Sequence, residues 1–248
     1  MTSRNHPSSA SALTAIEGLL SIELGDAMLA ERLAKWLVED TLSWHTTLIE
    51  RSSIDTLVAF SFGNRINPNG NREPGPVNRA LADILIDLHK DNAAHIYAQW
   101  EIAEAVGTRI PARSITPVFP TQNVLAEPVY LSTDGVMTAI SRLTKREPQL
   151  GRVGIVAFSD HQFRCVTVAR RHGLDAFAPA GVSMPSEYDT KSGQPWCRNR
   201  LAYLLHDIAE RINTRRADAI GPARKQLADH RSDAPVRSGA MRASRENR

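Results

Sequence analysis

The alternation of apolar and polar positions is clearest in the stretch 153–174. Residues Val153–Phe158 form a short apolar run rich in β-branched side chains, which is typical of a parallel strand covered on both faces. A polar turn at Ser159 and Asp160 follows, and apolar residues then recur with helical spacing as far as Gly173, which is expected to end the helix. The stretch therefore predicts a buried strand, a turn and a helix.

The same order of strand and helix recurs along most of the chain. Further strands are predicted at Thr56–Phe62, His95–Trp100, Ile115–Phe119 and Asp175–Pro179. Further helices are predicted to begin near Pro76, directly after Glu101, in GVMTAISRL, and at Trp196. The last of these is predicted to run to Ile212, and its apolar stripe consists of Leu201, Leu204, Leu205, Ile208 and Ile212. Strands that alternate with helices in this way predict an α/β fold with a mostly parallel sheet and helices on both faces.

Both ends of the chain differ in composition from this middle region. Residues 10–51 are helical in character, and Gly25 and Asp26 are expected to separate two helices there. After Asn213 the chain is basic and nearly free of large apolar residues, with nine Arg and Lys against four Asp and Glu, which predicts a disordered tail. The expected organisation is an N-terminal helical segment (1–53), an α/β domain (54–212) and a basic disordered tail (213–248).

Charge and cysteine content narrow the class of protein. The formal net charge of +3 comes from the tail, and the tail lacks the interleaved aromatic residues of single-strand binders, so nucleic acid is not the expected partner. Two cysteines without paired spacing indicate a reducing compartment instead of a disulfide framework or a zinc site. The sequence has no apolar run of spanning length and no secretory leader, which predicts a cytoplasmic protein without a membrane span.

Polar side chains follow the predicted strands at the point where each strand ends. In a parallel sheet these ends share one edge, where α/β proteins bind ligands and helix N-termini favour anions. The candidate ligand-binding residues at this edge are Gly63, Asn64, Arg65, Arg79, Ser132, Thr133, Ser159, Asp160 and Arg164. The candidate catalytic residues are His161 and Glu101, as acid/base groups.

Each of these residues also has a structural interpretation. Ser159 and Asp160 are common helix N-caps, and Thr133 or Asp134 is the expected N-cap of the GVMTAISRL helix. Glu101 is favoured at a helix start by the macrodipole alone. The Gly-rich dinucleotide, P-loop, nucleophile-elbow and HExxH motifs are all missing, so the sequence alone does not select a reaction.

Four segments together resemble the YdcF-like family, a domain of unknown function that includes the SanA and ElyC envelope-associated proteins. They are FSFGNRINPNG with Arg79, the turn at Glu101, LSTDGV, and AFSDHQFRCVTVARRHGL, and they cover residues 54–212. The resemblance implies a Rossmann-like three-layer sandwich. It also implies a link to S-adenosylmethionine, with which a YdcF relative is associated, or to peptidoglycan and lipid-carrier metabolism, with which the envelope-associated relatives are connected.

Three hypotheses of function follow. The first is an enzyme or binding protein for a small anionic or nucleotide-like ligand, with Arg65, Arg79 and Arg164 neutralising the anion and Ser132 and Thr133 donating hydrogen bonds. The second is a non-catalytic regulatory or cell-envelope-homeostasis factor that binds its ligand in the same cleft. The third is nucleic-acid binding through the tail, which would fall steeply with salt.

Overall fold

The α/β fold predicted from the sequence is confirmed by a computed structural model that describes residues 9–120, 131–144 and 150–232. Residues up to Ala209 form one compact unit, and residues from Glu210 form a second. The unit that ends at Ala209 contains a six-stranded sheet in which every pairing is parallel. Its strands are β1 (Leu48–Ile49), β2 (Thr56–Ala59), β5 (His95–Gln99), β6 (Ile115–Val118), β7 (Arg152–Val156) and β8 (Asp175–Pro179).

The order of the strands is that of a Rossmann-like sheet. Across the sheet it reads β1-β8-β7-β2-β5-β6. Numbered along the α/β region alone, β6, β5, β2, β7 and β8 are the third, second, first, fourth and fifth strands. The chain therefore leaves β2 toward β5 on one side and returns to β7 on the other, so the carboxyl ends of β2 and β7 form the topological switch point.

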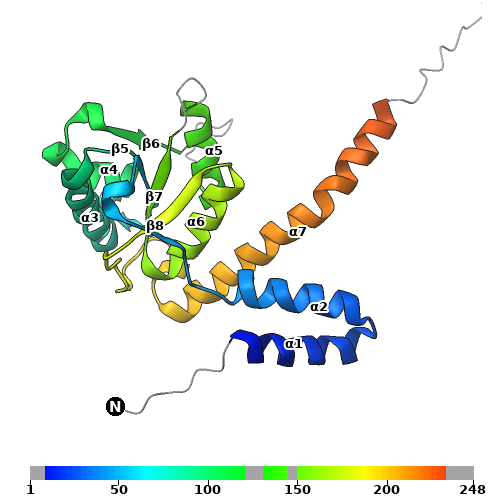
Figure 1. The fold of residues 1–248 in the computed structure, drawn as a ribbon. Helices are drawn as coiled ribbons and strands as arrows, with labels where there is room; N and C mark the ends of the chain where they lie inside the picture. Colours follow the sequence, from blue (N-terminus) through cyan, green and yellow to red (C-terminus); the bar gives the residue numbers. More distant parts are fainter. Residues whose placement is uncertain (1–8, 121–130, 145–149, 233–248) are drawn as a thin grey trace, which may run out of the picture. The chain divides into compact units, whose positions relative to one another are not determined.

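Helices cover both faces of the sheet (Figure 1). One face packs against α3 (Pro76–Asn92) and α4 (Trp100–Val106), and the other against α5 (Thr133–Leu143) and α6 (Gln162–Arg171). Alternate residues of β2 serve the two cores, because Leu57 and Ala59 face α3 while Val58 faces α5 and α6. This arrangement is the three-layer sandwich that the sequence predicted.

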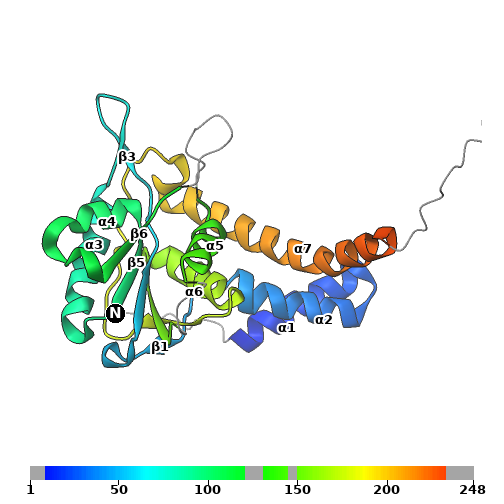
Figure 2. The same cartoon turned by 90° about the horizontal axis from the view of Figure 1, so that it is seen from above.

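The remaining elements flank the sheet in sequence. Helices α1 (Ser9–Leu24) and α2 (Ala27–Trp36) meet at Gly25 and Asp26 as predicted, and the Asp26 carboxylate caps α2 by accepting from the Leu29 amide. A short antiparallel hairpin, β3 (Arg65–Ile66) and β4 (Arg72–Glu73), projects from the sheet between β2 and α3 (Figure 2). Helix α7 runs from Arg200 to Ser232.

Several local predictions were wrong. The predicted helical region of residues 10–51 also contains the short strand β1, which pairs with β8. Helix α5 is capped by Ser132, whose Oγ accepts from the Gly135 amide at 3.1 Å, and not by Thr133 or Asp134. A 3-10 turn precedes α6, so neither Ser159 nor Asp160 caps that helix.

The predicted last helix was wrong in its start, its end and its buried face, since α7 begins at Arg200 and not at Trp196. Helix α7 continues past Ile212 as far as Ser232, within the region expected to be disordered; residues 233–248 lie outside the described part of the chain. The side chains of Leu201 and Leu205 are exposed at 71% and 61%, whereas Tyr203 and Asp207 are buried. The buried side of the helix therefore carries polar side chains, and their partner is Arg164 of α6.

Candidate functional site

The parallel sheet brings the ends of the predicted strands to one edge, as the sequence analysis expected. Gly63, Asn64 and Arg65 follow β2, and Glu101 lies in the first turn after β5. The Ser159–Arg164 stretch follows β7 beside them, because β7 is the neighbour of β2. Ser132 and Thr133 begin α5, and Arg79 lies in the first turn of α3.

Arg164 is buried and bonded within the protein. Its side chain reaches α7, where Nε donates to Asp207 Oδ1 at 2.5 Å, and α5, where a terminal nitrogen donates to Thr133 Oγ1 at 2.9 Å. Its other terminal nitrogen donates to the Tyr203 hydroxyl at 3.3 Å. Each nitrogen of the guanidinium thus has a protein acceptor, and Arg164 ties α5, α6 and the first turns of α7 together.

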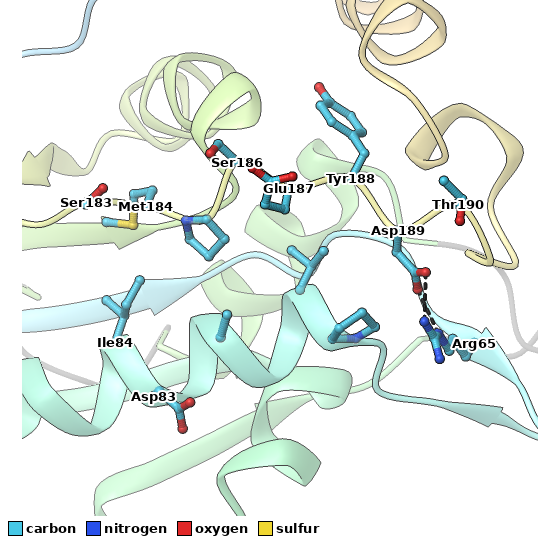
Figure 3. A pocket seen from close by; sticks show the side chains of 14 residues that line it. Arg65, Asp83, Ile84, Ser183, Met184, Ser186, Glu187, Tyr188, Asp189 and Thr190 are labelled. Atoms are coloured by element: carbon cyan, nitrogen blue, oxygen red, sulfur yellow. Dashed lines mark hydrogen bonds and ion pairs between the residues drawn. The ribbon is translucent and has the colours of Figure 1, made fainter.

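Arg65 is also paired with a carboxylate of the same chain. Its Nε and one terminal nitrogen donate to the two carboxylate oxygens of Asp189, each at 2.9 Å (Figure 3). The hydrogen bonds from Arg65 lower the pKa of Asp189 below its ordinary value. Asp189 belongs to residues 182–194, a segment without helix or strand that we call the strap.

The strap is fastened to the edge at several further points. The Ser159 amide donates to the Pro185 carbonyl at 2.9 Å, and the Gly193 amide donates to the Asn64 carbonyl at 2.7 Å. The Tyr188 hydroxyl donates to Asp160 at 2.8 Å. Burial and this bond raise the pKa of Tyr188 above its ordinary value. Through these contacts the strap covers the ends of β2 and β7, where the sequence predicted a ligand-binding cleft.

Asp160 and the loop after β2 help to hold the strap against the edge. The Asp160 carboxylate also accepts two hydrogen bonds from Arg200, at 2.9 and 3.1 Å. Gly63 has a φ of +71°, and a Cβ there would lie 2.5 Å from Ser192 Oγ, so a glycine is required at this position. The Asn78 side chain accepts from the Phe62 amide and donates to the Gly63 carbonyl, which fixes the end of β2.

The predicted acid/base group His161 is enclosed by aromatic rings at the switch point. Its side chain is 6% exposed. Its ring centroid lies 6.3 Å from the rings of Phe60 and Phe62 and 5.9 Å from the ring of Tyr203. Beside it, Phe62 of one strand end stacks on Phe158 of the other with centroids 3.9 Å apart. A packed aromatic cluster therefore fills the crevice between β2 and β7.

The predicted acid/base group Glu101 is a buried carboxyl group with a raised pKa. It is 5% exposed, and burial raises its pKa to about 7, because the removal of water penalises the carboxylate. A hydrogen bond from Ser61 and the nearby charge of Arg72 on the hairpin act in the opposite direction. Among the described residues, its Oε2 atom has no hydrogen-bond partner. A group that is half ionised near neutral pH can act as a proton acceptor or donor.

A cavity of about 740 Å³ opens between α3 and the strap (Figure 3). Arg65 and Asp189 lie at one end of it, and its lining includes Val77 and Ala80 of α3 and Met184 of the strap. This volume lies in the range of small-molecule sites. The exposed Arg79 faces a second, charged hollow with Glu73 and Glu104.

The residues that fasten the strap to the edge were not among the site residues predicted from the sequence. Asp189 and Tyr188 come from the polar loop after β8, whose place beyond a predicted strand end was a usable signal. Asp207 lies on the last predicted helix, and its pairing with Arg164 gives it a structural role. Asn78 and Tyr203 carried no signal, because their partners are distant in sequence or are backbone groups.

Comparisons with known proteins identify no relative, so the site is interpreted from its geometry alone. No family model, no curated protein and no solved structure matches the chain. Among the described residues, no cluster of side chains suits a metal ion. Nor does the described part of the chain contain a helix with the length and apolar character needed to cross a membrane.

Proposed function

We propose that the carboxyl edge of the sheet binds a nucleoside-containing small molecule, with Glu101 as the residue that accepts hydrogen bonds from the ribose hydroxyls. The single observation that carries the proposal is the place and state of Glu101. It lies at the end of the second strand of a Rossmann-like sheet, buried, with one carboxylate oxygen lacking a partner among the described residues.

The position of Glu101 supports a ribose as the ligand group. In Rossmann-like folds an acidic side chain near the end of the second strand binds the hydroxyls of the ribose, while the loop after the first strand approaches the phosphates. Here β5 holds the second position and Gly63–Arg65 the loop after the first. The resemblance to the YdcF-like family supports a ligand such as S-adenosylmethionine, which contains a ribose with both hydroxyls.

The buried Glu101 carboxyl group also carries an energetic penalty that a ligand would remove. A buried polar atom without a hydrogen bond costs about 1–3 kcal/mol, and the site keeps a carboxyl group at that cost. Perturbed carboxyl groups of this kind concentrate at functional sites. A ligand that donates to Oε2 would remove the penalty, and would lower the pKa of Glu101 by favouring its charged form.

A second candidate is a non-catalytic sensor or envelope-homeostasis factor that uses the same edge. The observation that favours it is the enclosure of His161 by Phe60, Phe62 and Tyr203, which keeps the imidazole away from water and from any ligand at the edge. The sensor would bind the nucleoside without converting it. In either case the proposal includes a cytoplasmic, reducing setting, supported by the buried thiols of Cys165 and Cys197.

A thermal-shift screen against adenosine, adenosine monophosphate, S-adenosylmethionine and sugar phosphates tests the proposal. We expect the nucleosides to raise the melting temperature of the wild type, and Glu101→Gln to abolish the shift. The matched control is Glu104→Gln, because Glu104 lies on the same helix, is exposed, and should leave the shift unchanged. A shift that survives Glu101→Gln, or the absence of any nucleoside shift, would contradict the proposal.

A further inference from the structure

We propose that Asp189 is an internal stand-in for the anionic group of the ligand, and that a phosphate or carboxylate displaces it from Arg65 when the ligand binds. The inference rests on the proposed function, since it concerns the charged part of the same nucleoside-containing ligand. It assigns Arg65 as the anion-binding residue of the edge and makes the strap the element that regulates access to it.

The geometry of the pair is that of an arginine holding an anion. Two parallel hydrogen bonds of 2.9 Å join Arg65 to both carboxylate oxygens, the arrangement in which guanidinium groups also bind phosphate. The side chain of Arg65 is 35% exposed, so a ligand can reach it, whereas that of Asp189 is 8% exposed. Of the predicted anion-binding arginines, Arg164 by contrast is enclosed and tied to Asp207.

The surroundings of Asp189 favour any negative charge. Its Oδ1 atom also accepts from the Lys191 amide at 3.1 Å. A Cβ placed on Gly75 would lie 3.3 Å from its Oδ2 atom, so the carboxylate lies against the backbone where α3 begins. Glu73 lies opposite Arg65 in the hairpin, and its negative charge stabilises the charged guanidinium. Once Asp189 has left, Glu73 is the carboxylate that competes with the ligand for Arg65.

The strap can release Asp189 without detaching as a whole. Its anchors to the edge lie on both sides, at Pro185 and Tyr188 before Asp189 and at Ser192 and Gly193 after it. Rotation of one side chain between those anchors is enough to free Arg65. The released Asp189 would turn into the 740 Å³ cavity that it already lines.

The test compares adenosine with adenosine monophosphate by calorimetry, in the full-length wild type and in Asp189→Asn. If the internal pair occupies Arg65 about nine-tenths of the time, its removal tightens the monophosphate about tenfold and leaves adenosine within about twofold. Arg65→Met in the Asp189→Asn background should abolish the gain. Asp83→Asn is the matched control, because it removes an acidic group from the same cavity while Arg65 stays paired.

Each outcome bears on one of the two proposals. If adenosine binds both proteins but Asp189→Asn leaves the monophosphate unchanged or weaker, the displacement is wrong and the proposed function stands. If adenosine binds neither protein, the proposed function fails, and the displacement is then tested by the thermal shift with inorganic phosphate. Phosphate stabilisation of Asp189→Asn that is lost on Arg65→Met supports the displacement. A phosphate shift equal to that of Asp83→Asn overturns it. Should Asp189→Asn fail to fold, Asp189→Ser removes the charge and keeps an acceptor for the Lys191 amide.

Discussion

At the scale of single residues, Glu101 differs from the other charged side chains of the edge in its raised pKa and its unbonded oxygen among the described residues. Most charged side chains at the edge found partners that the sequence could not show: Asp189 for Arg65, and Tyr188 and Arg200 for Asp160. Glu101 keeps an oxygen without a hydrogen bond among the described residues, and its pKa is raised to about 7. Residue type and strand position predicted that Glu101 was a candidate, but its burial depended on packing around α4 and Ser61.

The raised pKa makes stability fall with increasing pH. Glu101 holds its proton in the folded protein up to a pH of about 7, whereas in the unfolded chain it ionises near 4.5. Its contribution to the free energy of unfolding is therefore full below pH 4.5 and is lost progressively as the pH rises to 7, by about 3 kcal/mol in all.

Glu101→Gln should remove this dependence. The amide has the shape of the protonated acid and does not titrate, so we expect the variant to be more stable than the wild type at pH 8 and about equal to it at pH 4.5. Urea unfolding at a series of pH values measures the difference. The exposed Glu104→Gln should follow the wild-type curve, and a parallel curve for Glu101→Gln would show that Glu101 ionises normally in the folded state.

At the scale of elements, periodicity predicted β2, β5, β6, β7 and β8 and most helices, but not β1, the β3–β4 hairpin or the polar contacts. Strand β8 was placed at its observed bounds, and α3 begins at Pro76 as expected. The predicted apolar stripe of α7 was wrong, since Leu201 and Leu205 face outward. The side that packs inward instead carries Tyr203 and Asp207, because the buried Arg164 of α6 requires a carboxylate there. Apolar spacing cannot reveal a helix face that is selected by an ion pair.

The pair between Arg164 and Asp207 should hold α6 and α7 together strongly. Removing one partner from a buried pair leaves an uncompensated charge, so we expect Arg164→Ala and Asp207→Ala each to lower the free energy of unfolding by about 3–5 kcal/mol. The double variant should lose much less than the sum, because neither charge is then left without its partner. Chemical denaturation of the four proteins measures this coupling.

The control for that cycle is an exposed pair of the same types. Arg152 and Asp55 are each about half exposed and lie 3.3 Å apart, so Arg152→Ala should cost less than about 1 kcal/mol. If Arg164→Ala costs no more than Arg152→Ala, the buried pair is not a structural tie. This comparison also shows why Arg164→Ala is a poor probe of ligand binding: a loss of folding would mimic a loss of affinity.

At the scale of the whole molecule, a Rossmann-like sheet places one edge where a ligand is expected, and the strap covers the ends of β2 and β7 at that edge. The sequence predicted the sheet and the convergence of Gly63, Glu101 and His161 on its edge. It did not predict the closure, because the strap carries no periodic pattern and reaches the edge through backbone and side-chain contacts more than 20 residues away in the chain. In place of the open site predicted from the sequence, the edge carries the buried Glu101 with its raised pKa and a cavity between α3 and the strap.

Ribose binding at Glu101 is tested most directly by the affinity of the wild-type protein for adenosine compared with 2′,3′-dideoxyadenosine, measured by isothermal titration calorimetry. The base is common to both ligands, so the difference reports the ribose hydroxyls alone. We expect adenosine to bind at least about tenfold more tightly, because two hydrogen bonds to a charged acceptor are lost in the dideoxy form, and Glu101→Gln to remove most of that difference. Equal affinities for the two ligands, or a preference for adenosine that Glu101→Gln leaves intact, would contradict the assignment of Glu101 to the ribose.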